Sequence, residues 1–188
     1  MAVNAANARI YGSDADAIYL APIGTALPLD IDTPLSPAFE DVGWLNEDGI
    51  TESATGSRSE IRGHQGGNVV RTRVEGGGTT IAFVALEDKP QTRSLRYNVK
   101  ESTVTPGGAR RESRGAGQRI TARAAVIEMF DADDVTVRER ICIERLEVMP
   151  DGDRAFVNSD IAGFSLTGQV IGDYYTLTSG PAELVDGE

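Results

Sequence analysis

The sequence predicts an all-β domain with one short flanking helix. Three observations carry this prediction: 21 glycines, many Val, Ile and Thr residues, and apolar side chains that alternate with polar ones instead of recurring at helical spacing. A chain of 188 residues has the size of one domain and is long enough to bury a substantial core. We therefore expect a two-sheet β-sandwich or barrel-like domain with long loops.

Residues 1–38 are interpreted as an N-terminal arm. Residues 9–11 and 17–20 have the composition of short strands, but four prolines between residues 22 and 37 interrupt any regular ladder. Such an arm either wraps over its own domain or docks on a neighbouring subunit. The apolar residues around Tyr19 support docking on a neighbour. The first residues lack a basic region followed by an apolar one, so no secretory signal is expected.

The β-sandwich domain is expected over residues 39–173 and begins with a strand at residues 42–45, which holds the only tryptophan, Trp44. An Asp-Gly pair at residues 48–49 predicts a hairpin turn. Residues 51–67 are polar, contain several glycines and show no apolar periodicity, so they predict a long loop. A loop of this length at the end of a strand pair is suited to contacts outside its own domain.

The chain then returns through a strand at residues 68–74, a triple glycine and a second strand at residues 79–86, which holds the longest apolar run. Acidic residues and an early proline predict a helix from about residue 90 to residue 97. Its apolar content is low, so we expect it on the flank of a sheet. Residues 105–118 contain arginines among glycines and predict a second long loop.

Residues 119–148 form the clearest hairpin pattern, with a turn at residues 131–134. The apolar alternation changes parity after Ile143, which predicts a β-bulge near Glu144 and Arg145. Cys142 lies in an apolar strand and is expected to be a small buried side chain, and a single cysteine excludes an internal disulfide.

A half-buried strand is predicted over residues 160–172, where Phe164, Leu166, Gly168 and Val170 point inward. Residues 174–188 are interpreted as a C-terminal tail in which residues 174–177 add a last short strand.

Charge is unevenly distributed along the chain, whose formal net charge is −11. Residues 61–120 are basic, with eleven Lys and Arg against five carboxylates, whereas the flanking thirds are acidic. This asymmetry is either scatter that mixes on folding or a pattern that lets a basic face of one copy meet an acidic face of the next. The overall acidity argues against tight DNA binding, because phosphate contacts require uncompensated cations.

The sequence does not assemble a catalytic constellation. His64 is the only histidine and lies in the glycine-bearing loop, far from Cys142 along the chain. Zinc-ligand spacing and the nucleotide-binding glycine patterns are absent from the sequence. The longest apolar run is too short to span a bilayer. We therefore expect neither an enzyme nor a cofactor, a metal site or a membrane segment.

The order of these elements resembles a known family. The run VGWLNEDGI, a loop ending in GHQGG, and the run TTIAFVALED leading into a short helix resemble the major tail protein, or tail tube protein, of long-tailed phages with non-contractile tails. The likeness extends from about residue 39 to residue 173. It implies a helix beside the sandwich, and hexameric rings whose inner sheets join into one continuous β-barrel. It also implies that the rings stack into a tube that conducts DNA.

On this interpretation the protein is a structural subunit of the virion tail, made in the host bacterial cytoplasm. Its partners are other copies of itself and tail components such as the initiator, tape measure and terminator, while DNA passes without specific binding. The alternatives are another virion β-sandwich, such as a capsid decoration or head-tail completion protein, and a carbohydrate- or ligand-binding module. The candidate subunit contacts are Tyr19, Thr51, Ser57, Arg58, Arg62, His64, Arg110, Arg111 and Arg114.

Overall fold

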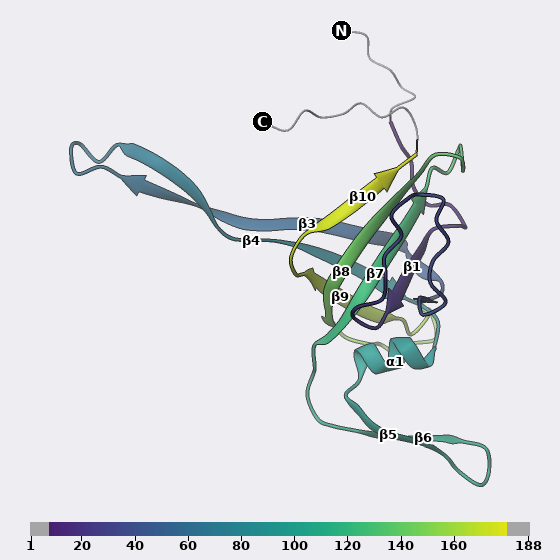
Figure 1. Cartoon of the computed structure of the whole chain (residues 1–188). Helices are drawn as coiled ribbons and strands as arrows, with labels where there is room; N and C mark the ends of the chain where they lie inside the picture. Colours follow the sequence, from purple (N-terminus) through teal and green to yellow (C-terminus); the bar gives the residue numbers. More distant parts are fainter. Residues whose placement is uncertain (1–7, 180–188) are drawn as a thin grey trace.

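The computed structural model describes residues 8–179 and shows a mostly β protein with one short helix, which confirms the predicted fold class (Figure 1). Most strands belong to one large antiparallel sheet, and two form a small separate sheet. The elements are β1 (Ala17–Ala21), β2 (Glu40–Asp41), β3 (Leu45–Arg62), β4 (Val69–Ala85), α1 (Pro90–Arg96), β5 (Val99–Val104), β6 (Arg110–Arg114), β7 (Thr121–Phe130), β8 (Arg138–Pro150), β9 (Phe164–Val170) and β10 (Tyr174–Thr178).

The large sheet has the order β2-β1-β7-β8-β9-β4-β3, and it forks at β8. The first half of β8 pairs with β10 and its second half with β9. Between the halves, Glu144 and Arg145 face a single residue of β7, so the β-bulge predicted at this position is confirmed. The bulge bends β8 and lets the sheet fold over into two halves that face each other.

The main core lies between these two halves. Buried side chains from β1, β7 and β8 meet buried side chains from β4 and β9, and the largest of them is Phe164. The predicted alternation of β9 is confirmed, because its residues 164, 166, 168 and 170 are buried and the intervening ones are half-buried. This strand therefore presents one face to the core along its whole length.

A second, smaller core covers the opposite face of β1, β7, β8 and β10. It contains Cys142, whose predicted burial is confirmed, and it is closed by Leu27, Leu35 and Phe39. Those three side chains come from the connection between β1 and β2. The apolar side chains of this part of the expected arm are thus packed against the protein's own sheet.

Arg140 fixes this covering segment, which we define as residues 22–39. Its Nη1 donates to the carbonyl oxygens of Asp30 and Thr33, at 3.1 and 2.8 Å, and its Nη2 forms an ion pair with the cross-strand Glu128. The Arg140 and Glu128 side chains are only 6 and 11% exposed. Tyr175 of β10 adds a hydrogen bond from its hydroxyl to the Pro28 carbonyl. The covering segment is thus held against the sheet by hydrogen bonds from β8 and β10.

Helix α1 forms where the sequence predicts it, one residue shorter. Pro90 occupies its first turn, and the Thr92 hydroxyl accepts from the Lys89 backbone N–H. The helix lies beside β8 and β9, and Leu95 is fully buried in the main core. The expectation that this helix only flanks the sheet is therefore corrected, because one of its side chains completes the core.

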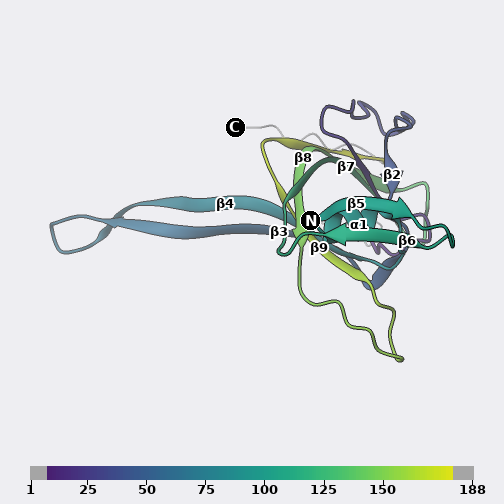
Figure 2. The ribbon, with the colours of Figure 1, turned by 90° about the horizontal axis from the view of Figure 1, so that it is seen from below.

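The predicted loop at residues 51–67 is instead most of a β-strand. β3 runs unbroken to Arg62 and pairs with β4 along its length, so that only residues 63–68 connect the two strands. We call residues 55–78 the distal hairpin, and it projects far from the body in two perpendicular views (Figures 1 and 2). Both faces of the distal hairpin are open to solvent, so its strands carry no apolar alternation for a sequence analysis to detect.

The predicted turn at Asp48-Gly49 is likewise absent. Leu45 pairs with Ala85 and Ile50 with Phe83, so residues 46–49 bulge out of a continuous β3. Gly49 has φ +64°, which suits the bulge as well as it would have suited a turn. The Asp-Gly pair therefore predicted the positive φ of Gly49 correctly, but the hairpin turn predicted from it is wrong.

One further sequence prediction is wrong and one is confirmed. The predicted loop at residues 105–118 contains β6, which pairs with β5 from Val104↔Arg110 to Val99↔Arg114. In the predicted C-terminal tail, Tyr174–Thr178 forms β10 and pairs with β8, which confirms the last short strand expected there. Residues 180–188 lie outside the described residues.

Gly168 is a position where close packing excludes a side chain. A Cβ at this residue would lie 2.6 Å from Leu146 Cγ in the main core. We expect Gly168→Ala to lower the free energy of unfolding by about 1–3 kcal/mol, because the added methyl overpacks a buried contact. Urea unfolding checks this, with Gly107→Ala as the matched control, since nothing lies within 4 Å of a Cβ there. Equal stabilities of the two variants would contradict the prediction.

Candidate assembly surface

The distal hairpin and the strand leading into it carry five of the nine predicted contact residues. Thr51 lies where β3 leaves the body, and Ser57, Arg58 and Arg62 follow along the same strand. His64 lies in the turn that ends the hairpin. All five are exposed, so the structure places them together on one projecting element.

Apolar and basic side chains share the surface of this hairpin. Val70 and Val74 are each 72% exposed, and Ile61 is 47% exposed. Four arginines stand against two glutamates: Glu60 pairs with Arg58 and Arg62, and Glu75 pairs with Arg73. Arg71 forms no ion pair within residues 8–179. A two-stranded ribbon that projects from the body and exposes valines has the properties of a binding element.

The sheet also ends in a long free edge. β3 pairs only with β4 among the described strands, so one side of an 18-residue strand presents unpaired backbone N–H and C=O groups. Natural monomers rarely leave such an edge exposed, because it recruits further strands. The sheet has two other ends: the two-residue β2, which offers little to pair with, and the five-residue β10, which among the described strands pairs only with β8.

Tyr19 is placed differently from the hairpin residues. It lies in β1 between β2 and β7 and packs, half-buried, against the second core. Burial raises the pKa of its hydroxyl, and nearby Glu128 adds to the increase. The Tyr19 ring therefore packs mainly within its own chain.

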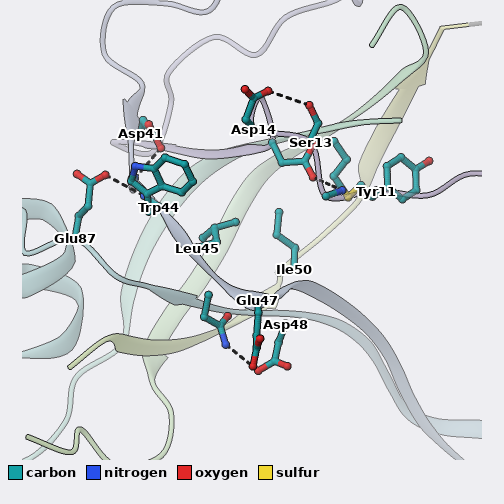
Figure 3. Close-up of a pocket in the computed structure, with 16 residues that line it drawn as sticks. Tyr11, Ser13, Asp14, Asp41, Trp44, Leu45, Glu47, Asp48, Ile50 and Glu87 are labelled. Carbon is teal, nitrogen blue, oxygen red and sulfur yellow. Dashed lines mark hydrogen bonds between the residues drawn. The ribbon is translucent and has the colours of Figure 1, made fainter. Parts of the chain in front are cut away.

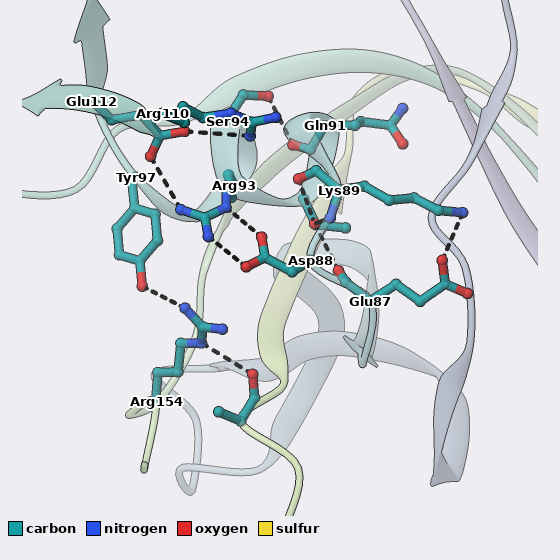
Figure 4. A network of polar contacts seen from close by, with 12 residues as sticks. Glu87, Asp88, Lys89, Gln91, Arg93, Ser94, Tyr97, Arg110, Glu112 and Arg154 are labelled. Carbon is teal, nitrogen blue, oxygen red and sulfur yellow. Dashed lines mark hydrogen bonds and ion pairs between the residues drawn. The ribbon is translucent and has the colours of Figure 1, made fainter. Parts of the chain in front are cut away.

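The three predicted arginines of β6 divide between its two faces. Arg114 lies over the Tyr97 ring, 3.7 Å from the centroid, and pairs with Glu112. Arg110 lies 3.7 Å from the same Glu112, as Figure 4 shows. Arg93 of α1 also reaches Glu112, which joins the small β5–β6 sheet to the helix. Arg111 alternates to the other face and is exposed. Arg110 and Arg114 therefore hold their own chain together, and Arg111 alone points away.

Glu112 gives this junction a pH dependence. Its hydrogen bond from Arg114 and the nearby Arg93 lower the pKa of the Glu112 carboxyl. A lowered pKa means that the carboxylate stabilises the fold at neutral pH, and that this contribution is lost as pH falls through the folded-state pKa. We expect Glu112→Gln to be less stable than the parent chain at pH 7, with the difference shrinking towards about pH 3. Urea unfolding at both pH values measures this, and a difference independent of pH would contradict it.

A cleft of about 580 Å³ lies at the start of β3, and the sequence analysis did not identify it (Figure 3). Its wall includes Trp44, which is 70% exposed and whose backbone N–H donates to Glu87 at 3.0 Å. That hydrogen bond lowers the pKa of the Glu87 carboxyl, and a smaller effect of the Lys89 side chain lowers it further. The available signal was the lone tryptophan beside an Asn-Glu-Asp-Gly run. The carboxylates that line the cleft are Asp14, Asp16, Asp41, Glu47, Asp48 and Glu87.

Comparison with known protein families identifies the family of this chain. A family model described as "Phage tail tube protein" matches residues 1–177 of the 188. The chain belongs to the phage tail tube protein family. No match was found among curated proteins. The resemblance drawn from the order of the strands is therefore confirmed.

Membership in the tail tube family makes the protein a structural component of the virion tail. It points to a non-enzymatic protein that assembles with itself and with other tail components. Within residues 8–179 no three His, Cys, Asp or Glu side chains are grouped so as to hold a metal ion. The helical part of the described chain is a single seven-residue helix, which could not cross a membrane.

Proposed function

We propose that this tail tube protein forms hexameric rings, that its inner sheets join into one continuous β-barrel, and that stacked rings conduct DNA during ejection. One observation carries the proposal: the sheet ends in an 18-residue edge strand whose far half extends into solvent as a hairpin. In a ring, this free edge pairs with the sheet of a neighbour, which satisfies its backbone groups.

The distal hairpin supplies the reach between subunits. Residues Ser57, Arg58, Arg62 and His64 lie on it, and Thr51 lies at its base, so we assign these five to contacts between copies. Arg111 is the β6 arginine available for charge pairing with a neighbour, because Arg110 and Arg114 bind Glu112 of their own chain. Tyr19 is assigned to the support of the covering segment, which shares the second core with it.

The net charge of −11 fits a channel that lets DNA pass. Tight phosphate binding needs uncompensated cations, and an acidic wall repels the phosphate backbone instead of holding it. The protein is accordingly proposed to work without a cofactor and without specific DNA contacts. The tail initiator, tape measure and terminator are its proposed further partners.

Electron microscopy of the concentrated protein, alone and with the tail-tip complex of its phage, tests this function. We expect rings or tubes with six subunits in projection and a lumen wide enough for duplex DNA. Native mass spectrometry gives the copy number independently. A chain that remains monomeric both alone and with the tail-tip complex would overturn the proposal, and rings of another copy number would overturn the hexamer.

A further inference from the structure

The cleft at Trp44 is strongly acidic and only partly neutralised. Six carboxylates line it, and no Lys or Arg is among the described residues of its wall. Within residues 8–179, Glu87 alone of the six forms an ion pair, with Lys89 at 3.3 Å. Leu45, Ile50 and Met129 add apolar side chains to the lining of the same cleft. Its chemistry therefore suits a cationic group carried on an apolar stem or surface.

The exposed indole of Trp44 adds a second preference. A guanidinium placed over an indole face is attracted by the ring, and arginine makes this contact more often than lysine. Carboxylates beside the ring accept the guanidinium N–H groups in paired hydrogen bonds. Figure 3 shows Trp44 together with Asp41 and Glu87 on one side of the cleft. An arginine side chain thus satisfies both parts of this wall.

The distal hairpin has the matching surface. Four arginines against two glutamates leave it with two positive charges in a chain that is otherwise acidic. By the pairing register, one face carries Arg71 and Arg73 beside Ile61, and the other carries Arg58 beside Val74. Each face therefore combines guanidinium groups with an exposed apolar side chain, which is the combination that the cleft accepts.

The cleft and the hairpin turn lie at opposite ends of one strand. Trp44 directly precedes β3, and the turn at residues 63–68 directly follows it. An extended strand of this length spans on the order of 60 Å, so the hairpin does not fold back into its own cleft. Complementary surfaces at opposite ends of a molecule make head-to-tail contacts, and such contacts close into rings or build filaments.

We propose that the Trp44 cleft of one copy receives the distal hairpin of a neighbouring copy, with hairpin arginines against the indole and its flanking carboxylates. This inference rests on the proposed self-assembly and adds the receiving surface to it. The cleft volume lies in the range of pockets that hold small ligands, so the cleft takes a few side chains of the hairpin and not the whole ribbon.

The fluorescence of Trp44 reports whether the cleft is occupied, because Trp44 is the only tryptophan in the sequence. On assembly we expect its emission to shift to shorter wavelength and its quenching by acrylamide to fall several-fold. Tubes or rings that form while Trp44 stays as quenchable as in the monomer would overturn the inference and leave the proposed function intact. Protection that other tail proteins cause without the formation of rings or tubes would assign the cleft to those proteins and also overturn the inference.

Charge reversal tests the pairing without depending on its detailed register. Arg71→Glu with Arg73→Glu changes the hairpin, and Asp14→Lys with Glu47→Lys changes the cleft. We expect each pair to reduce sedimentable assembly about tenfold or more, and the combined four-residue variant to recover to within about threefold of the parent. Lys100→Glu with Arg119→Glu is the matched control for the hairpin pair, since it changes the net charge by the same amount and sign at exposed residues outside both surfaces.

Circular dichroism and urea unfolding establish that each variant is folded before assembly is compared. A combined variant that assembles no better than the two separate pairs would overturn the proposal. Full assembly of either pair alone would do the same.

Discussion

Removing the distal hairpin is expected to abolish assembly while leaving the body folded. Thr55 and Gly78 face each other in the pairing register, so an Asn-Gly turn inserted between them closes the shortened β3–β4 hairpin without strain. The removed residues, 56–77, are almost all exposed and contribute little to either core. We expect the midpoint of thermal unfolding to change by only a few degrees, on the order of 1 kcal/mol or less.

Tube yield, in contrast, is expected to fall by about a hundredfold or more, because losing the main anchors of an interface costs about 3 kcal/mol per contact. Sedimentation and electron microscopy of the folded variant measure this loss. The matched control shortens the other exposed hairpin in the same way, with Asn-Gly in place of residues 105–109 between the paired Val104 and Arg110. Normal tubes from the shortened β3–β4 chain would contradict the prediction.

Arg140→Ala is expected to be the most destabilising single substitution named here. The change leaves Glu128 as a buried charge without its cation, and it removes the donor to the carbonyls of Asp30 and Thr33. Loss of one partner of a buried pair costs about 3–5 kcal/mol. Urea unfolding measures this cost, and a value below about 1 kcal/mol would contradict the assignment.

Two comparisons separate charge from packing in this result. Arg138→Ala removes a more exposed arginine of the same strand, which pairs with Asp32, and it should cost only about 1 kcal/mol. The double variant Glu128→Met with Arg140→Met removes both charges at once, so it should recover much of the stability lost in Arg140→Ala. If the double variant were as unstable as Arg140→Ala, packing and not the unpaired charge would explain the loss.

The parts of the fold predicted correctly from sequence are those with one buried face. β9 alternates cleanly, and the parity change after Ile143 located the bulge that bends β8. The distal hairpin was missed for the opposite reason: between residues 55 and 78 both faces meet solvent, so no side-chain period marks the strands. The sequence of this segment is polar and contains glycines, and this composition is common to loops and to solvent-exposed ribbons.

The candidate site was predicted in part, and the missing part depends on long-range contacts. The hairpin residues were selected as outward-facing, and the structure places them on one element. The covering segment was one of two alternatives for the arm, and the sequence could not decide between them, because Arg140 binds backbone carbonyls, which carry no side-chain signature. The Trp44 cleft was missed because Asp14, Trp44 and Glu87 are brought together only when three distant segments meet.

The position of β1 has a consequence for how the chain folds during synthesis. β1 is held by β7, whose residues follow about a hundred positions later, and it has only the two-residue β2 on its other side. Until β7 leaves the ribosome, β1 has no stable partner, and such long-range pairing makes folding slow. The β3–β4 pair needs no later residues, so during synthesis β1 waits longer for its partner strand than β3 does.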